Sequence, residues 1–315
     1  MRAAVVDRFG PPSVVHLADV PAPAARPDEV LVRVATAAVT VADSRIRGAR
    51  FPRGFGPIAR LVFGPLRPRR KVLGSSFSGV VDAVGSDVVG LAVGDEVCGM
   101  TGVSMGAHAE FIAVPTKRVV GKPAQVTPDD AAAVLFGGTT ALSYLRDKGG
   151  VRPGQSVLVN GASGAIGTNA VQLAKHFGAT VTAVTSGPNA QLVTDLGADR
   201  VIDYTRTPLS QLTERFDVVL DTVGNVTISS GKRLLNPGGV LLLAVADLWQ
   251  AIGARGNVKA GPAPERAEDA ELLLQLVADG TLKVVIDHAY ELDEIVAAHE
   301  RVDTGHKIGN VIVHP

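Results

Sequence analysis

Residues 156–177 read SVLVNGASGAIGTNAVQLAKHF. The stretch begins as a short apolar strand, passes through a turn that contains Gly161, Gly164 and Gly167, and continues with the apolar spacing of an amphipathic helix. A strand, a glycine-rich turn and a helix in this order present free N–H groups and the positive end of the helix dipole to a phosphate. The stretch therefore predicts an α/β unit that binds a dinucleotide.

The glycine spacing is Gly-x-x-Gly-x-x-Gly, and each glycine has its own task in this prediction. Gly161 permits a tight turn, Gly164 lets a pyrophosphate approach the backbone, and Gly167 lets the helix pack against the strand. Three further turn residues complete the predicted cradle: Ser163, Ala165 and Ile166. The alternative is an ordinary tight turn between a strand and a helix.

Two predicted helices precede this stretch, and predicted strands and helices alternate after it. Before it, Asp129–Val134 and Thr140–Lys148 are predicted as two helices. The elements predicted after it are strands Thr180–Thr185, Arg200–Ile202, Asp217–Asp221 and Val240–Ala244 and helices Asn189–Leu196 and Thr227–Leu234. This alternation is typical of a doubly wound parallel sheet.

The first part of the chain, up to about residue 120, has a different pattern. Short β-branched runs bounded by Gly and Pro predict strands at Ala3–Val6, Glu29–Val34, Gly79–Val84 and Ala109–Val114. No long amphipathic helix is expected there. The tail is predicted to form helices Ala267–Asp279 and Leu292–Val302 and a last strand Lys307–Val313. The fold class is therefore α/β, with a β-rich domain beside the parallel sheet.

The composition limits the classes of function. The chain has 315 residues, 46% of them hydrophobic, with 31 basic and 31 acidic side chains. It can bury a large core, and its balanced charge offers no general attraction to nucleic acid. Cys98 is the single cysteine, which excludes an internal disulfide and a zinc site built from several cysteines. No apolar run is long enough for a membrane span and the N-terminus reads as a strand, so a cytoplasmic location is expected.

The end of the second predicted strand bears on the choice between NADPH and NADH. An NAD site usually places an acid there to hold the ribose 2′-hydroxyl. Thr180–Thr185 is followed by Ser186 and Asn189 instead, and the nearest acid beyond them is Asp195. Ser186 and Asn189 can donate hydrogen bonds to a 2′-phosphate, although no Lys or Arg lies in this stretch; the alternative is that they cap the next helix. The missing acid favours NADPH.

Several short motifs occur together in a specific order along the chain. They are Gly94-Asp95-Glu96-Val97, Gly106-Ala107-His108-Ala109-Glu110-Phe111, Gly137-Gly138-Thr139-Thr140-Ala141, Asn160–Gly167, Gln172-Leu173-Ala174-Lys175, Leu196-Gly197-Ala198-Asp199, Val201-Ile202-Asp203-Tyr204 and Asp221-Thr222-Val223-Gly224. With these motifs the chain resembles, over nearly its whole length, the medium-chain dehydrogenase/reductase superfamily. The resemblance is to its zinc-independent quinone oxidoreductase branch, the ζ-crystallin-like enzymes.

The resemblance implies a GroES-like β-rich catalytic domain in residues 1–122, a Rossmann NADPH-binding domain in 123–262, and a return to the catalytic domain in 263–315. It implies that Tyr204 lines the 2′-phosphate pocket and that Thr139 and Val245 approach the nicotinamide half of the cofactor. Two more cofactor contacts are expected on the same basis, Val223 and Asn310. A homodimer joined at the edges of the Rossmann sheets is also expected.

Zinc-dependent members of this superfamily use an early Cys and a Gly-His-Glu segment. Here the first position lies in Ala38-Val39-Thr40-Val41-Ala42-Asp43 and the second resembles Gly74-Ser75-Ser76, so no metal site is expected. Zinc-free relatives often carry Asn and Asp at the spacing of Thr40 and Asp43. These two residues are the candidates for catalysis, and hydrogen bonds that cap the loop are the alternative.

The segment from Arg45 to Lys71 contains nine basic residues and no acid, interspersed with apolar side chains. In related proteins this segment flanks the substrate cleft. Three interpretations are open: a lid over a hydrophobic substrate, a solvated loop, or a contact with an anionic membrane surface.

These features together predict an NADPH-dependent reductase of a quinone or an α,β-unsaturated carbonyl, because such acceptors need no metal to take up hydride. One alternative is a dedicated reductase of a single biosynthetic enone. Another is a protein that holds NADPH as a sensor or structural ligand with little turnover.

Overall fold

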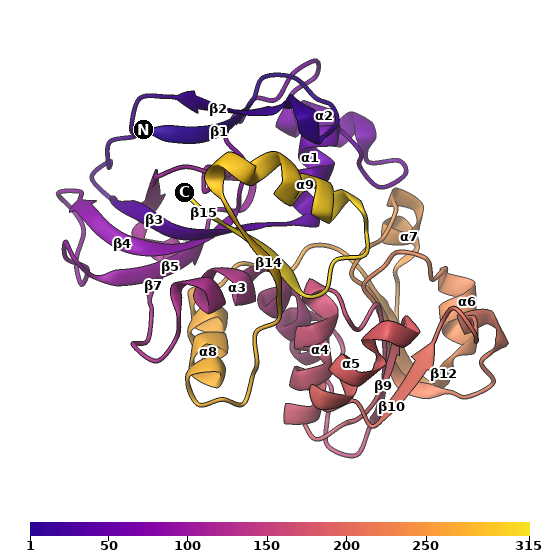
Figure 1. The fold of residues 1–315 in the computed structure, drawn as a ribbon. Coiled ribbons are helices and arrows are strands. Elements are labelled where there is room, and N and C mark those ends of the chain that lie inside the picture. The colour runs from indigo at the N-terminus through magenta and orange to yellow at the C-terminus, as the bar shows by residue number, and fades with distance from the viewer.

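The computed structural model describes residues 1–315 and contains two large sheets, each with its own helices (Figure 1). The first sheet has six strands in the order β10-β9-β8-β11-β12-β13, and all of its pairings are parallel. Its strands are β8 (Ser156–Asn160), β9 (Thr180–Thr185), β10 (Arg200–Asp203), β11 (Phe216–Asp221), β12 (Leu235–Leu243) and β13 (Val258–Lys259). The strand order reverses between β8 and β11, which confirms the predicted doubly wound sheet and places a crevice at their carboxyl ends.

The helices of this part are α3 (Pro128–Leu142), which continues as a π-helical segment over Ser143–Lys148, α4 (Ala165–His176), α5 (Ala190–Asp195), α6 (Ile228–Arg233), α7 (Leu248–Gly253) and α8 (Ala267–Ala278). The sequence predicted two helices, Asp129–Val134 and Thr140–Lys148, where α3 is continuous; Gly137 and Gly138, which lie between the predicted helices, do not end it. Instead they permit close packing: a Cβ on Gly137 would lie 2.2 Å from the Ala165 carbonyl oxygen, and one on Gly138 would lie 2.9 Å from Leu273 Cδ1.

The second sheet has seven strands in the order β14-β15-β3-β4-β5-β7, and β6 also pairs with β3. Its strands are β3 (Glu29–Val39), β4 (Ser76–Val84), β5 (Glu96–Met100), β6 (Phe111–Pro115), β7 (Val119–Gly121), β14 (Ile286–Glu291) and β15 (Asn310–His314). A separate hairpin joins β1 (Arg2–Val6) to β2 (Val15–Asp19). Short 3-10 helices occupy Pro12–Val14, Gly102–Ser104, Thr116–Arg118, Gly187–Asn189, Leu209–Gln211 and Leu292–Glu294.

The β-rich part also contains helices that the sequence did not predict. Two of them, α1 (Val41–Gly48) and α2 (Gly56–Phe63), are each only eight residues long, so their apolar periodicity is too brief to stand out. In the tail, α9 (Ile295–Asp303) was predicted, whereas β14 was not, because its residues are mostly polar or half-buried. No helix of the chain is both long enough and apolar enough to cross a membrane.

One large hydrophobic core lies mainly against the parallel sheet and another in the β-rich part, and the first also includes Cys98, Met100 and Val120 of the second sheet. Leu273 and Leu274 of α8 pack into the core of the parallel sheet, although α8 lies in the tail of the chain. The tail joins the second sheet only from β14 onward. The predicted division at residues 122 and 262 remains a prediction.

Candidate functional site

The glycine turn lies at the carboxyl end of β8, where the sequence predicted it. Gly161 has φ +83°, and a Cβ on Gly167 would lie 2.1 Å from the Gly161 carbonyl oxygen, so both positions require glycine. A Cβ on Gly164 would meet nothing closer than 3.5 Å, which leaves open space beside the backbone. No side chain caps α4, so the first-turn N–H groups of Ala165 and Ile166 are free for an anion. This geometry fits the pyrophosphate of a dinucleotide.

The polar residues expected around the adenosine form one hydrogen-bonded group next to this turn. The Ser163 hydroxyl accepts a bond from Thr185 Oγ1 at 2.9 Å and from Asn189 Nδ2 at 3.2 Å, and Asn189 Nδ2 also donates to Ser186 Oγ at 3.2 Å. Neither Ser186 nor Asn189 caps a helix with its side chain. Tyr204, which follows β10, is 44% exposed and donates its backbone N–H to the Thr185 carbonyl.

The preference for NADPH was predicted from the absence of an acid at the end of the second strand, and the structure corrects this absence. Asp203 pairs in register with Thr185, because β10 runs parallel to β9, and a Cβ on Gly187 would lie 2.8 Å from Asp203 Oδ2. Asp203 Oδ1 is taken by the Thr205 N–H and hydroxyl, and these bonds are the main reason that the pKa of Asp203 is lowered. The positive charge of Arg206 lowers that pKa further. Arg206 thus supplies, on the loop after β10, the cation that the sequence after Thr185 lacks.

The C-terminal segment also reaches the glycine turn. The Gly309 N–H donates to the Ser163 carbonyl at 2.8 Å, and Gly309 forms an isolated bridge with Gly164. The Lys307 ammonium donates to the Gly309 carbonyl, and burial lowers the pKa of Lys307 to about 8. Sequence reasoning missed this lysine because it lies about 140 residues from the turn along the chain. Asn310, a predicted cofactor contact, is buried and donates its side-chain amide to the Val285 carbonyl.

A buried carboxylate organises the loop that follows β11. Asp221 is fully buried and accepts bonds from the backbone N–H groups of Val223, Gly224 and Val226 and from Asn160 Nδ2. Burial raises the pKa of Asp221. A Cβ on Gly161 would lie 2.7 Å from Val223 Cγ2, so this loop packs directly on the glycine turn.

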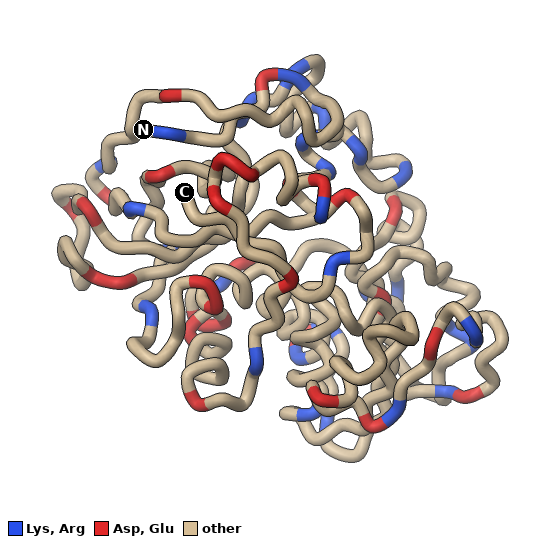
Figure 2. The backbone as a smooth tube through the Cα atoms, viewed as in Figure 1, with Lys and Arg blue, Asp and Glu red and all other residues tan.

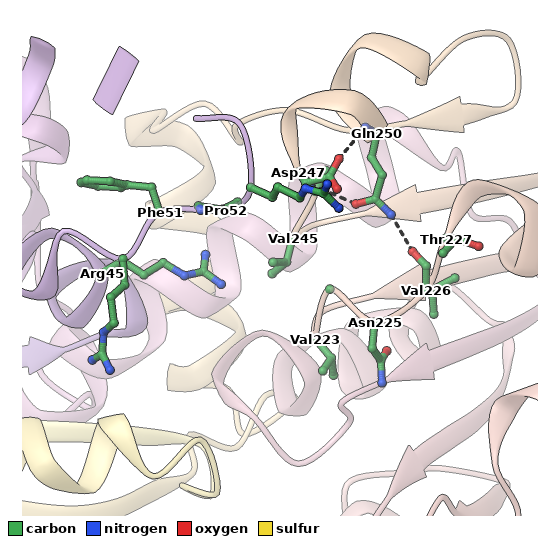
Figure 3. A pocket seen from close by; sticks show the side chains of 14 residues that line it. Arg45, Phe51, Pro52, Val223, Asn225, Val226, Thr227, Val245, Asp247 and Gln250 are labelled. Atoms are coloured by element: carbon green, nitrogen blue, oxygen red, sulfur yellow. Dashed lines mark hydrogen bonds between the residues drawn. The ribbon is translucent and has the colours of Figure 1, made fainter. Parts of the chain in front are cut away.

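A cavity of about 450 Å³ lies between the two parts of the molecule (Figure 3). Val223 and Val245, both predicted to contact the cofactor, line its wall on the parallel-sheet side, and a Cβ on Gly224 would lie 2.7 Å from Val245 Cγ1. Arg45, Phe51 and Pro52 line the opposite wall, which comes from the chain that follows β3 (Figure 3). Thr139 is not among the lining residues: it is buried in α3 and donates to the Leu135 carbonyl at 2.6 Å. The cavity therefore adjoins one end of the cofactor cradle.

Two family models match the chain: the alcohol dehydrogenase GroES-like domain over residues 26–124 and the zinc-binding dehydrogenase over residues 196–313. A 2-methylene-furan-3-one reductase from Solanum lycopersicum is 33% identical over 100% of this chain and 79% of its own length. A chloroplastic NADPH-dependent alkenal/one oxidoreductase from Arabidopsis thaliana is 30% identical over 100% of this chain and 80% of its own. The solved quinone oxidoreductase from Coxiella burnetii aligns with TM-score 0.90 and 29% identity, covering 100% of this chain and 99% of that one.

The chain is a medium-chain dehydrogenase/reductase of the zinc-independent quinone oxidoreductase branch. Its second sheet is the GroES-like domain and its parallel sheet is the Rossmann domain, as predicted. A mycobacterial neighbour solved in complex with NADPH has TM-score 0.82 and 26% identity over 100% of both chains.

In this medium-chain dehydrogenase/reductase, Thr40 and Asp43 form a capping box at the start of α1. Asp43 Oδ2 accepts from the Thr40 N–H at 2.8 Å and from the Thr40 hydroxyl at 2.6 Å, and Asp43 Oδ1 accepts from the Gly74 N–H at 2.9 Å. Asp43 is fully buried and Thr40 nearly so. These bonds fix the loop that carries α1 at the edge of the cavity; a part in chemistry stays a prediction for both residues.

The residues present do not fit a zinc ion, although one family model carries zinc in its name. No group of three or more His, Cys, Asp or Glu side chains is placed to hold a metal. Both carboxylate oxygens of Asp43 already accept hydrogen bonds, and the His108 ring bonds to the Ala38 carbonyl at 3.1 Å. Burial raises the pKa of the Cys98 thiol to about 12, which disfavours the thiolate that zinc binds.

Proposed function

We propose that this protein is an NADPH-dependent reductase that transfers hydride to a quinone or an α,β-unsaturated carbonyl. The observation that carries the proposal is that Val223 packs on the glycine turn and also lines the cavity between the domains, so a dinucleotide cradle adjoins a partly open space large enough for a small acceptor. The relatives named for enone, alkenal and quinone reduction support the same class of acceptor.

The cradle residues in this proposal each have a stated task. N–H groups of the first turn of α4 bind the pyrophosphate. The hydrogen-bonded side chains of Ser163, Ser186 and Asn189 hold the adenosine ribose, together with Tyr204. Val223 and Val245 form the wall on which the nicotinamide rests, and Thr139 supports it from within α3. The proposed cofactor contacts are Thr139, Gly161, Ser163, Gly164, Ala165, Ile166, Gly167, Ser186, Asn189, Tyr204, Val223, Val245 and Asn310.

The cofactor supplies hydride from its nicotinamide ring when bound. The chain holds donor and acceptor close together and shields them from water. Thr40 and Asp43 are proposed as positioning residues, because their bonds fix α1 and the cavity wall that follows it.

Steady-state oxidation of NADPH tests the proposal, with a panel of quinones and a panel of enones. We expect turnover with at least one panel and a preference for NADPH over NADH. One enone far better than all quinones would identify a dedicated enone reductase. Tight NADPH binding with no accepted substrate would identify a sensor or structural protein and overturn the proposal.

We also propose that the chain is a homodimer joined at the free edge of the Rossmann sheet. β13 is one of the two edge strands, β10 being the other, and no strand of the chain pairs with its outer side, so a second copy can extend the sheet there. Light scattering after size exclusion measures the mass directly, and a monomer at micromolar concentration would contradict it. A cytoplasmic location is proposed with it, and fractionation of the source cells tests that.

Peripheral contact with an anionic membrane is proposed for α2. No residue of this helix is buried. Leu61 is 70% exposed, and Leu66, just beyond the helix, is 89% exposed. Figure 2 shows basic residues recurring along the chain around α1 and α2. Exposed apolar side chains interspersed with cations match an anionic lipid surface. Sedimentation with vesicles of neutral and anionic lipid tests this contact: Leu61→Glu is expected to abolish binding, whereas Val89→Glu, at a residue 91% exposed elsewhere, is the control.

A further inference from the structure

Three arginines line the GroES-like side of the cavity: Arg45, Arg50 and Arg53. The opposite wall contributes one acid, Asp247. Asp247 caps α7 by accepting from the Gln250 N–H at 2.7 Å and lies within salt-bridge distance of none of the three. The cavity between the domains therefore carries an excess of positive charge.

The Arg45 guanidinium has no partner within the protein. It is half-buried on α1 and forms no hydrogen bond and no ion pair, and burial lowers its pKa. Arginine stays charged under these conditions, so a partly desolvated guanidinium without a counter-ion is costly unless a ligand supplies one.

The acid that pairs with arginines on this side of the cavity, Asp303, is already taken. Asp303 Oδ2 accepts from Arg47 Nη2 and from Arg50 Nη2, both at 2.6 Å, and its other oxygen accepts from the Ser44 hydroxyl. Asp303 thus pairs the next two arginines after Arg45 in the sequence, Arg47 and Arg50, but not Arg45 itself. Arg53 likewise forms no ion pair.

We propose that Arg45, assisted by Arg53, binds an oxyanion of the hydride acceptor, either a carboxylate or a phosphate. The inference rests on the proposed function, since it assigns the cavity to the acceptor. The cofactor's pyrophosphate is not the anion in question, because it is served by the first turn of α4, and none of residues 161–167 lines the cavity. Guanidinium binds both oxyanions through paired, charge-assisted hydrogen bonds.

The test compares acceptors with and without an anionic group. The neutral enone (E)-3-penten-2-one is set against (E)-4-oxopent-2-enoate, in which a carboxylate replaces the terminal methyl group, and acryloyl-coenzyme A is the phosphate-bearing arm. Comparing each variant with the wild type on the same acceptor removes the difference in intrinsic reactivity between acceptors. We expect wild-type kcat/KM to favour one anionic acceptor. Arg45→Gln is expected to lower the ratio of anionic to neutral kcat/KM by about 10- to 100-fold, chiefly through KM for the anion, with KM for NADPH unchanged. The arm that responds identifies the carboxylate or the phosphate.

Arg45→Lys keeps the charge and is expected to restore part of the ratio. Arg60→Gln is the matched control, because Arg60 lies on α2, is exposed and does not line the cavity, so the ratio is expected to stay at its wild-type value. Equal loss on neutral and anionic acceptors would overturn the inference in favour of a structural role. So would a raised KM for NADPH, or a wild-type preference for the neutral enone.

A binding measurement separates this inference from the proposed function. Calorimetric titration of the NADPH-loaded protein with 4-oxopentanoate, the saturated product of the carboxylate arm, reports the anion site without turnover. Binding that Arg45→Gln weakens, with no turnover of any acceptor, would leave the anion site standing and overturn the reductase function. If the protein turns over neutral enones and Arg45→Gln changes neither turnover nor binding in any arm, the reductase function stands and the anion site is overturned.

Discussion

Asp43 illustrates how one buried carboxylate fixes a wall of the cavity. It accepts three hydrogen bonds, from the N–H and hydroxyl of Thr40 and from the Gly74 N–H, and so ties α1 to the chain before β4. The adjacent basic segment extends from this anchored helix.

Replacing Asp43 with alanine leaves the Thr40 and Gly74 N–H groups buried without partners. We therefore expect Asp43→Ala to lower the free energy of unfolding by about 2–4 kcal/mol, as measured by urea denaturation. Asp28→Ala, at an exposed residue whose carboxylate has no partner, is expected to change it by less than about 0.5 kcal/mol. A loss for Asp43→Ala no larger than for the control would contradict this role.

Lys307 predicts a pH dependence of cofactor binding. Its pKa is lowered to about 8, so the ammonium is protonated below that pH and neutral above it. A positive charge beside the phosphate turn attracts NADPH, so the dissociation constant is expected to rise by about three- to tenfold as pH rises through about 8. Fluorescence titration with NADPH on either side of that pH measures the change.

Lys307→Met is expected to bind NADPH weakly at both pH values, without the step. Lys283→Met, at an exposed lysine of the same tail, is expected to keep it. A step of the same size in Lys307→Met would assign the titration to another group.

At the residue scale, the sequence located the groups that are contiguous with the glycine turn and missed those brought to it by folding. Gly161, Gly164 and Ser163 could be placed because strand, turn and helix follow one another. Asp203 and Lys307 could not, because the pairing of β10 with β9 and the return of the tail bring them there.

The turn and first residues of α4 form the element on which the cofactor prediction depends, and two of its glycines are distinguishable by experiment. We expect Gly164→Ala to keep the fold, because its Cβ meets nothing within 3.4 Å and its φ of −81° suits alanine, but to weaken NADPH binding about tenfold or more. Gly167→Ala drives a Cβ to 2.1 Å from a carbonyl oxygen and is expected to lower the melting temperature as well. Thermal unfolding and NADPH titration of both variants check the contrast; equal melting temperatures would refute it.

Element prediction succeeded where the local pattern was clear and failed where tertiary packing decided. β8 and β9 have the predicted bounds, since each is an apolar run bounded by turn residues. α3 continues through Gly137 and Gly138 because α4 and α8 pack closely against them, which no local pattern reveals. The resemblance placed the basic segment beside the substrate cleft, but its position opposite Val223 depends on how the two domains pack.

At the scale of the whole molecule, His299 links global stability to pH. It is fully buried on α9, neither ring nitrogen has a hydrogen-bond partner, and its pKa is lowered well below 6.5 by burial and by the charges of His108 and Arg47, against the opposing effect of Asp303. The unfolded chain takes up a proton at this residue as pH falls below about 6.5, whereas the folded chain does not. Stability is therefore full above that pH and declines below it.

The contribution of His299 is a slope of up to about 1.4 kcal/mol per pH unit on the acid side. We expect His299→Leu to flatten the dependence of unfolding free energy on pH by that amount, as measured by urea denaturation between neutral and mildly acidic pH. His306→Gln, at an exposed histidine, is expected to leave the slope unchanged. An unaltered slope in His299→Leu would assign the acid sensitivity elsewhere.

β15 lies inside the mixed sheet, between β14 and β3, although it is made after every other strand. During synthesis, the six strands of the Rossmann sheet have all emerged before β14 and β15 exist, and domains generally fold as units while the chain grows. The GroES-like sheet, begun first, must wait with the edge of β3 at Ala37–Val39 unpaired until β15 has been made. The order in which the two domains mature is thus the reverse of the order in which they start, and the waiting β3 edge is a surface of the nascent chain that chaperone binding would protect.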